Sequence, residues 1–181
     1  MKIIGICGSS RENSNSTRMV EEVLKGAKDA GAEIEIIKLG ELNIKCCGGC
    51  LECDETGRCH LDDDLAAVLD KMVKANGFVF GTPARFDNVS GLMKNFMDRT
   101  NPLCKCLLLK GKVTGLVTVG YFPKDISRER VLDCLDNFCE AHGIKVIGEV
   151  VAYERSGKTG RIAENKDILG KCYQLGQKLV T

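Results

Sequence analysis

The chain has 181 residues, a formal net charge of +1 and 44% hydrophobic residues. This length is typical of one domain with a substantial core, so we expect a single domain over residues 1–181. The balanced charge, without a long run of like charges, argues against binding to nucleic acid or to an anionic membrane. No apolar run reaches the length of a membrane span. Small molecules and proteins are the expected partners.

Eleven cysteines would suit a disulfide-bonded secreted protein. The chain, however, starts directly with an apolar run and shows no signal peptide, so a reducing cytoplasm is the expected compartment. Cys7, Cys134, Cys139 and Cys172 occupy apolar positions of predicted strands or helices, where a free thiol behaves as a small hydrophobe. We expect these thiols to pack in the core.

Five short runs rich in branched apolar residues are typical of buried parallel strands. They are Ile3–Ile6, Ile34–Ile37, Phe78–Phe80, Val113–Val119 and Ile144–Val151. Amphipathic helical patterns between and after them lie around 19–27, 65–73, 90–101, 127–142 and 165–180. This alternation predicts a doubly wound α/β sheet of the flavodoxin-like type, with strand order 2-1-3-4-5. The ligand crevice of such a sheet lies beyond the carboxyl ends of strands 1 and 3.

The loop after the first strand, from Gly8 to Thr17, is rich in hydroxyl side chains and leads into a helix. Its backbone N–H groups, its hydroxyls and the Arg11 guanidinium can converge on a phosphate at the helix N-terminus. The loop has neither a dinucleotide-binding nor a P-loop glycine pattern, and its Ser, Thr and Asn side chains suit a terminal phosphomonoester. FMN is the common ligand of this description. An ordinary capped helix with a Ser-rich loop is the alternative.

The second predicted strand is followed by a cysteine-rich loop over residues 45–61. Cys47, Cys50 and Cys53 form a C-x2-C-x2-C run, as in ferredoxin-type loops, and Cys59 can supply a fourth thiolate. This spacing predicts an iron–sulfur cluster.

Two alternatives to the cluster stay open. Zinc sites usually separate two C-x2-C pairs by a dozen or more residues, so zinc fits this run less well. Reduced structural or redox thiols are the second alternative. Cys46 would break the spacing and is not expected to be a ligand, and His60 is expected to be a surface residue.

The loop after the third predicted strand runs from Gly81 to Gly91. It can present Pro83, Phe86 and backbone amides to a flat ring, while Arg85 and Asn88 offer hydrogen-bond donors to a pyrimidine edge. By itself this segment indicates only a loop.

Together these segments resemble the NAD(P)H-dependent FMN reductase group of flavodoxin-like proteins. That group has a Gly-Ser-x-Arg phosphate loop, a G-[TS]-P-x-[YR]-F segment and a K-x-F-[MI]-D-R helix, which correspond here to residues 8–11, 81–86 and 94–99. With its four spaced cysteines the chain is similar to the iron–sulfur flavoproteins of archaea and anaerobic bacteria. The resemblance spans nearly the whole chain.

The resemblance implies the cofactors and the residues that hold them. It implies that a [4Fe-4S] cluster is bound by Cys47, Cys50, Cys53 and Cys59. It implies that the FMN phosphate is held by Ser9, Ser10, Arg11, Asn15, Ser16 and Thr17. It implies that the flavin ring lies on Thr82, Pro83, Ala84, Arg85, Phe86 and Asn88, with the loop after the fourth strand alongside.

The resemblance also implies an activity. Electrons would pass between a ferredoxin-type donor, the cluster and FMN, with dioxygen, peroxide or another small molecule as acceptor. The chain would form a homodimer or homotetramer in which the cluster of one subunit lies near the FMN of its neighbour. The alternatives are a cluster-free NAD(P)H-dependent FMN or quinone reductase, because cluster-free relatives have a similar cysteine spacing, and a redox-sensing binding protein.

Overall fold

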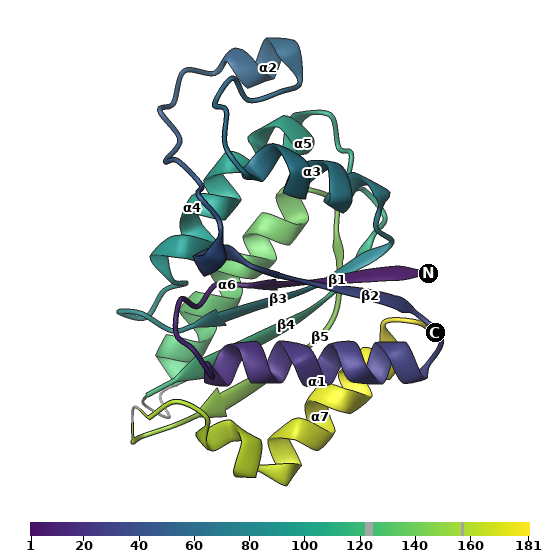
Figure 1. The fold of residues 1–181 in the computed structure, drawn as a ribbon, viewed down its shortest axis with the longest axis vertical. Helices are drawn as coiled ribbons and strands as arrows, with labels where there is room; N and C mark the ends of the chain where they lie inside the picture. The colour runs from purple at the N-terminus through teal and green to yellow at the C-terminus, as the bar shows by residue number, and fades with distance from the viewer. Residues whose placement is uncertain (122–124, 157) are drawn as a thin grey trace.

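A computed structural model of the chain describes residues 1–121, 125–156 and 158–181. It contains one five-stranded sheet in which all neighbouring strands are parallel, and the strand order is β2-β1-β3-β4-β5 (Figure 1). The strands are β1 (Lys2–Cys7), β2 (Glu33–Lys38), β3 (Gly77–Pro83), β4 (Val113–Gly120) and β5 (Lys145–Tyr153). The predicted flavodoxin-like topology is confirmed.

Helices cover both faces of this sheet (Figure 1). One face packs on α1 (Asn15–Asp29) and α7 (Lys166–Lys178). The other face packs on α3 (Leu65–Lys74), α4 (Gly91–Arg99) and α6 (Asp125–Ala141). Because successive side chains of a strand point to opposite faces, β1 contributes apolar residues to both cores.

Four short elements lie between the long ones. They are the 3-10 turns η1 (Leu39–Glu41) and η2 (Arg161–Glu164) and the helices α2 (Glu52–Thr56) and α5 (Asn101–Lys105). The helix predicted around 90–101 ends at Arg99, and Pro102 lies in the first turn of α5. Proline is tolerated in a first turn, but it has no N–H to bond to the carbonyl of Asp98 four residues earlier, so one predicted helix becomes two.

The cysteines expected in the core are there. Cys7, Cys139 and Cys172 are buried, and burial raises the pKa of each thiol to about 12. Cys134 is partly buried and packs against the core on the α6 face. All eleven cysteines are free thiols. The buried ones act as small hydrophobes, and none of them is ionised at neutral pH.

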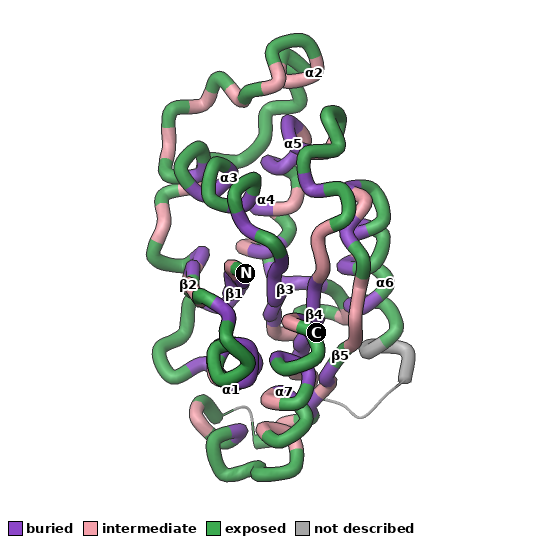
Figure 2. The backbone as a smooth tube through the Cα atoms, turned by 90° about the vertical axis from the view of Figure 1, so that its right-hand side faces the viewer, coloured by how far each residue is buried: buried purple, intermediate pink, exposed green. Residues whose placement is uncertain are grey.

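The cysteine-rich loop projects from one end of the domain, together with α2 (Figure 2). No residue of α2 is buried, whereas the strands and α1 carry many buried residues. Within the described ranges, no helix is both long enough and apolar enough to cross a membrane.

Candidate functional site

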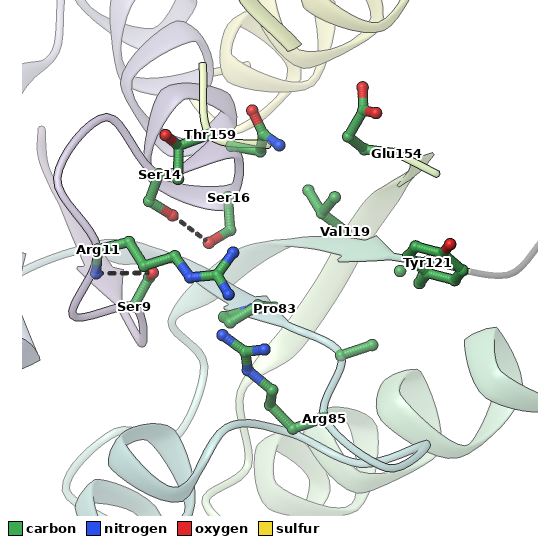
Figure 3. A pocket seen from close by; sticks show the side chains of 13 residues that line it. Ser9, Arg11, Ser14, Ser16, Pro83, Arg85, Val119, Tyr121, Glu154 and Thr159 are labelled. Atoms are coloured by element: carbon green, nitrogen blue, oxygen red, sulfur yellow. Dashed lines mark hydrogen bonds between the residues drawn. The ribbon is translucent and has the colours of Figure 1, made fainter. Parts of the chain in front are cut away.

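A cavity of about 250 Å³ lies beyond the carboxyl ends of the strands, where the topology predicts a ligand crevice. Four segments line it: the loop after β1, the loop after β3, the end of β4, and the residues beyond β5 that include Glu154 and Thr159 (Figure 3). We call this cavity the crevice.

The N-terminus of α1 forms one wall of the crevice. Ser14 caps the helix, and its Oγ accepts a hydrogen bond from the Thr17 N–H at 3.4 Å and lies 3.0 Å from Ser16 Oγ. The first turn of α1 contains no acidic residue. Hydroxyls and the partial positive charge of the helix end are therefore available for an anion.

Two arginines add positive charge to the crevice. Figure 3 shows the guanidinium groups of Arg11 and Arg85 pointing into it from the loops after β1 and β3. The Arg11 backbone N–H donates to Ser9 Oγ at 3.3 Å, which shapes the loop. Hydroxyls and guanidinium groups are the donors that recognise phosphate, so this donor set fits a phosphomonoester.

The loop after β3 forms a two-residue hairpin. Arg85 and Asn88 exchange backbone hydrogen bonds of 2.8 and 3.0 Å. Phe86 (φ 49°) and Asp87 (φ 59°) at its tip both have left-handed backbone, which is costly for a bulky residue such as Phe. Phe86 is fully exposed, and the Asn88 side chain accepts a hydrogen bond from the Val89 N–H at 2.8 Å.

A buried hydrogen-bond chain joins the first and third loops. Thr82 is fully buried and its Oγ1 accepts a hydrogen bond from the Ser90 N–H at 3.0 Å, while Ser90 Oγ donates to the Gly8 carbonyl at 2.5 Å. A Cβ on Gly8 would lie 3.0 Å from both Met93 Cβ and Ser90 Oγ. Glycine at this position therefore lets the two loops approach closely.

Seven of the twelve residues expected to bind FMN line the crevice: Ser9, Arg11, Asn15, Ser16, Pro83, Ala84 and Arg85. Ser10 and Thr17 line a neighbouring hollow instead, and Thr82, Phe86 and Asn88 line neither.

The Asn15 amide has partners within the chain. It donates to the Lys158 carbonyl at 3.0 Å and accepts from the Ile162 N–H at 3.2 Å. It therefore holds the segment after β5 against α1.

Gly120 and Tyr121, which begin the loop expected beside the ring, also line the crevice. Sequence reasoning did not select four further lining residues: Ser14, Val119, Glu154 and Thr159. The signal that could have found Val119 and Glu154 is topological, because they stand at the carboxyl ends of β4 and β5. Phe122 and Pro123, which belong to the loop expected beside the ring, lie outside the described residues.

A second cavity, of about 490 Å³, brings the four predicted cluster ligands together. Cys47, Cys50, Cys53 and Cys59 all line it, and Cys46 does not. We call it the cysteine cavity. It shares no lining residue with the crevice.

Cys104 of α5 also lines the cysteine cavity and donates its thiol hydrogen to the Ala141 carbonyl at 3.2 Å. The Asn101 amide donates to Cys53 Sγ at 3.2 Å. Helix α5 therefore contributes a fifth sulfur and a hydrogen bond to a predicted ligand, neither of which the cysteine spacing indicates.

His60 lies closer to the thiols than the sequence suggested. Its Nδ1 is 3.5 Å from Cys50 Sγ and 3.3 Å from Glu52 Oε2, and its side chain is 48% exposed. Within the described residues, these three side chains form the only group of three or more possible metal ligands within 4.8 Å of one another. That spacing suits a single ion, whereas a cubane spreads its four thiolates over four irons.

Two buried nitrogens beside the thiols have no hydrogen-bond partner in the part of the chain that the structure describes: Arg99 Nε and His142 Nδ1. Both residues line the cysteine cavity. Four thiols supply the ligand type that iron–sulfur clusters need, and an unpaired N–H can donate to sulfur. The residues present therefore fit an iron–sulfur cluster.

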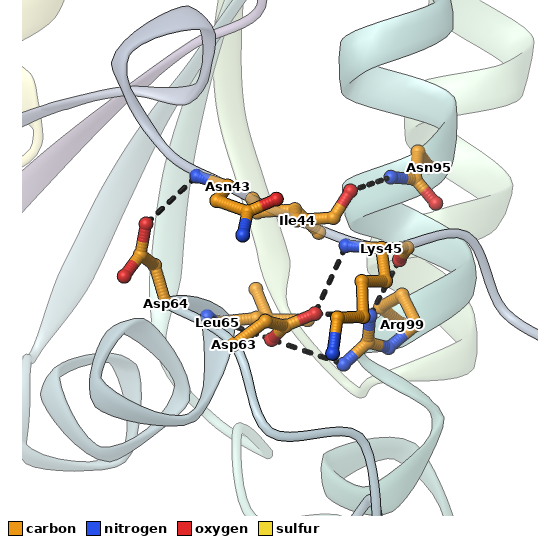
Figure 4. A network of polar contacts seen from close by, with 8 residues as sticks. All are labelled: Asn43, Ile44, Lys45, Asp63, Asp64, Leu65, Asn95 and Arg99. Atoms are coloured by element: carbon orange, nitrogen blue, oxygen red, sulfur yellow. Dashed lines mark hydrogen bonds and ion pairs between the residues drawn. The ribbon is translucent and has the colours of Figure 1, made fainter.

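A buried ion pair lies at the base of the cysteine-rich loop (Figure 4). Arg99 donates to both carboxylate oxygens of Asp63, at 2.7 and 3.2 Å, and to the Lys45 carbonyl. The Lys45 N–H donates to the same carboxylate at 2.9 Å. The side chains of Arg99 and Asp63 are 1% and 0% exposed.

The neighbouring residues extend this network. Asp64 Oδ2 accepts from the Asn43 N–H at 2.7 Å, and the Asn95 amide donates to the Ile44 carbonyl at 3.0 Å. We call the contacts of residues 43–45, 63, 64, 95 and 99 the clasp, because they join the two ends of the loop to each other and to α4. Asp63 also serves the N-terminus of α3, because its Oδ1 accepts a hydrogen bond from the Leu65 N–H at 3.1 Å.

In the clasp, charge and burial shift pKa values in opposite directions. Burial raises the pKa of Asp63, but hydrogen bonds from Arg99, Lys45 and Leu65 outweigh it, so the pKa is lowered. Burial lowers the pKa of Arg99, but Asp63 and the Cys59 sulfur raise it by more. Both groups are therefore charged at neutral pH.

His142 is a buried neutral imidazole. The Thr100 hydroxyl donates its hydrogen to the Met97 carbonyl at 2.7 Å, so at 2.9 Å it must accept from His142 Nε2–H. Nδ1 then carries a free lone pair. Burial lowers the pKa of His142 to about 4.

His142 is therefore expected to make stability depend on pH. The unfolded imidazole takes a proton below about pH 6.5, whereas the folded one resists it down to about pH 4. The full stability is present above pH 6.5 and falls by about 3 kcal/mol as the pH drops through this window, at about 1.36 kcal/mol per unit. Urea unfolding of a His142→Gln variant should show a flatter profile.

Comparison with known proteins identifies the family. The profile described as NADPH-dependent FMN reductase matches residues 1–157. The chain belongs to this family. An iron–sulfur flavoprotein of Methanocaldococcus jannaschii is 37% identical to the chain over 160 residues, which cover 88% of this chain and 82% of the relative. An iron–sulfur flavoprotein of Methanosarcina thermophila is 29% identical over 150 residues, covering 82% and 78%.

Solved structures support the same fold. The chain superposes on flavone reductase with a TM-score of 0.78 and 26% identity. The match covers 99% of this chain and 62% of flavone reductase, so the chain spans about three fifths of that protein's length. An NADH:FMN oxidoreductase superposes with a TM-score of 0.74 at 17% identity, which shows the fold alone.

Proposed function

We propose that the protein carries electrons between a ferredoxin-type donor, a [4Fe-4S] cluster held by Cys47, Cys50, Cys53 and Cys59, and FMN in the crevice. The main support is the cysteine cavity, because a chain of the FMN reductase family has four spaced thiols lining one cavity beside an unpaired Arg99 Nε. When bound, FMN exchanges electrons in pairs or singly and the cluster passes one at a time.

The residues of the chain would bind and position the cofactors rather than move protons. The hydroxyls around Ser14 and Ser16, with Arg11, would hold the FMN phosphate at the N-terminus of α1. Pro83 and Arg85 would contact the ring. One-electron transfer between the cofactors requires no paired acid and base.

Helix α4 gives the scale of the separation between the two sites. Ser90, just before α4, bonds to the loop after β1, and Arg99 at its end lines the cysteine cavity. Nine helical residues span about 13 Å at about 1.5 Å per residue.

We propose a homodimer or homotetramer in which one subunit's cysteine-rich loop lies near its neighbour's crevice. The proposed setting is a reducing cytoplasm, with dioxygen, peroxide or another small molecule as acceptor.

Anaerobic reconstitution tests this function. The expected product holds one FMN and about four iron and four sulfide per chain. It should be reduced faster by reduced ferredoxin than by NADH or NADPH. FMN without iron, and reduction by NADPH, would instead establish a cluster-free FMN or quinone reductase, which the family's description favours as the second candidate. Both cofactors without turnover by any donor would indicate a redox sensor.

Arg11 is expected to contribute to FMN affinity through a charge-assisted contact with the phosphate. Arg11→Ala should weaken binding by about 1.5–3 kcal/mol, or about 10-fold to 150-fold in Kd. Arg18→Ala is the matched control, because Arg18 lies in α1, just after the Arg11 loop, but pairs with Glu22 at 2.8 Å and does not line the crevice. Fluorescence titration of the flavin-free protein measures both. Equal Kd values for Arg11→Ala and wild type would remove Arg11 from the phosphate site.

A further inference from the structure

The clasp orders the base of the cysteine-rich loop. Residues 45 and 63, at the two ends of the loop, meet through the Lys45 N–H and the Asp63 carboxylate, and Arg99 donates to both ends (Figure 4). A two-point fork between guanidinium and carboxylate fixes orientation as well as distance. The Arg99 side chain is therefore held rigidly at the edge of the cysteine cavity.

Only one of the two charged residues of this ion pair lines the cysteine cavity. Arg99 lines the cysteine cavity, and Asp63 does not. The carboxylate thus lies behind the guanidinium, and the positive end of the pair faces the cavity. Arg99 also interacts with Cys59, the last of the four spaced cysteines.

One nitrogen of Arg99 has no hydrogen-bond partner among the described residues. Its Nη1 and Nη2 atoms bond to Asp63 and Lys45, whereas the buried Nε bonds to none of these residues. A buried N–H without a partner is costly, and such groups in native proteins usually mark a missing ligand or a functional site. Thiolates and cluster sulfides are acceptors for such a donor.

We propose that Arg99 is a positioning residue for the cluster: it donates its Nε–H to a sulfur on the Cys59 side and places the positive end of the ion pair beside the cluster. This inference rests on the proposed function and extends it to the control of the cluster's potential. The reduced cluster carries one more negative charge than the oxidised one, so a fixed cation beside it favours reduction. The electron comes from the ferredoxin-type donor, and the guanidinium keeps its proton throughout.

The test uses variants with opposite expected signs. Arg99→Gln removes the cation, so the equilibrium constant for reduction of the cluster should fall about tenfold. For one electron, this lowers the cluster's reduction potential by about 59 mV. Asp63→Asn keeps hydrogen-bond acceptors for Arg99 but leaves its charge uncompensated, so the potential should rise. Mere loosening of the loop would move both variants in the same direction.

Two further variants complete the set. Arg99→Gln combined with Asp63→Asn leaves no buried charge and should have a potential between those of the single variants. Lys171→Gln is the matched control, because Lys171 pairs with Asp167 on α7 and neither residue lines the cysteine cavity. It should leave the potential unchanged. Anaerobic redox titration followed by EPR measures the potentials, and iron and sulfide assays establish that each sample is loaded.

The outcomes separate this inference from the proposed function. Iron-loaded wild type with opposite shifts in the two single variants supports both. Iron-loaded wild type with equal potentials, or with shifts of one sign, overturns the role of Arg99 and leaves the proposed function standing. Wild type that takes up no iron overturns the proposed function and this inference together.

Discussion

Anaerobically reconstituted protein is expected to lose most of its iron, about four atoms per chain, when Ala replaces any one of Cys47, Cys50, Cys53 or Cys59. A [4Fe-4S] core requires a protein ligand on each iron, and these are the spaced thiols of the cysteine cavity. Iron and sulfide assays, with the broad visible absorption beneath the flavin bands, measure the loss.

The same variants should retain FMN, since the two cavities have no lining residue in common. A cysteine variant that loses both cofactors would point to misfolding rather than to a lost ligand. Cys46→Ala and Cys106→Ala are the matched controls, because both thiols are exposed and neither lines the cysteine cavity.

Three results would change the assignment of ligands. Loss of iron from Cys46→Ala, with Cys47→Ala intact, would make Cys46 the first ligand. Loss of iron from Cys104→Ala would bring the fifth sulfur of the cavity into the set. Zinc in the wild type that disappears with His60→Ala would establish a single-ion site at Cys50, Glu52 and His60.

The sheet was predictable because its strands are short apolar runs, and the inner strands β1, β3 and β4 are buried on both faces. Ile3, Ile4 and Ile6 illustrate this, since one packs toward α1 and α7 and the other two toward α3, α4 and α6. Helix α2 was not predictable, because Glu52–Thr56 buries nothing and shows no apolar period. It is held by Asn101, whose amide donates to Asp54 at 2.8 Å from another helix.

The candidate site, too, has parts that a local sequence pattern predicts and parts that it does not. Ser9, Ser16 and Arg11 lie in one short stretch that leads into a helix, so their type and order indicate a phosphate loop. The pairing of Asp63 with Arg99 joins residues 36 positions apart, and no local pattern connects them. The side chain of Asn88 bonds to the next residue's backbone, a choice that depends on the hairpin and not on composition.

The second large effect is expected from Asp63→Ala. Arg99 would then remain buried without its counterion, and breaking a buried pair in this way costs about 3–5 kcal/mol. The matched control is Asp98→Ala, because the Lys94–Asp98 pair lies on the surface of α4 and such pairs contribute about 0–1 kcal/mol. Urea unfolding should be compared on protein stripped of cofactors, since a bound cluster or flavin adds its own binding free energy to stability.

Acid provides a second measurement of the same pair. Arg99 and the backbone N–H groups hold the pKa of Asp63 below its ordinary value, so the carboxylate's contribution is fully present above the unfolded pKa of about 3.9. It is lost as the pH falls through the folded pKa, because the folded state must then take up the proton. The wild type should therefore lose this contribution below about pH 4, and Asp63→Ala should lack that part of the slope. Equal stability of Asp63→Ala and wild type at pH 7 would show that the clasp does not hold the loop, whatever the cluster does.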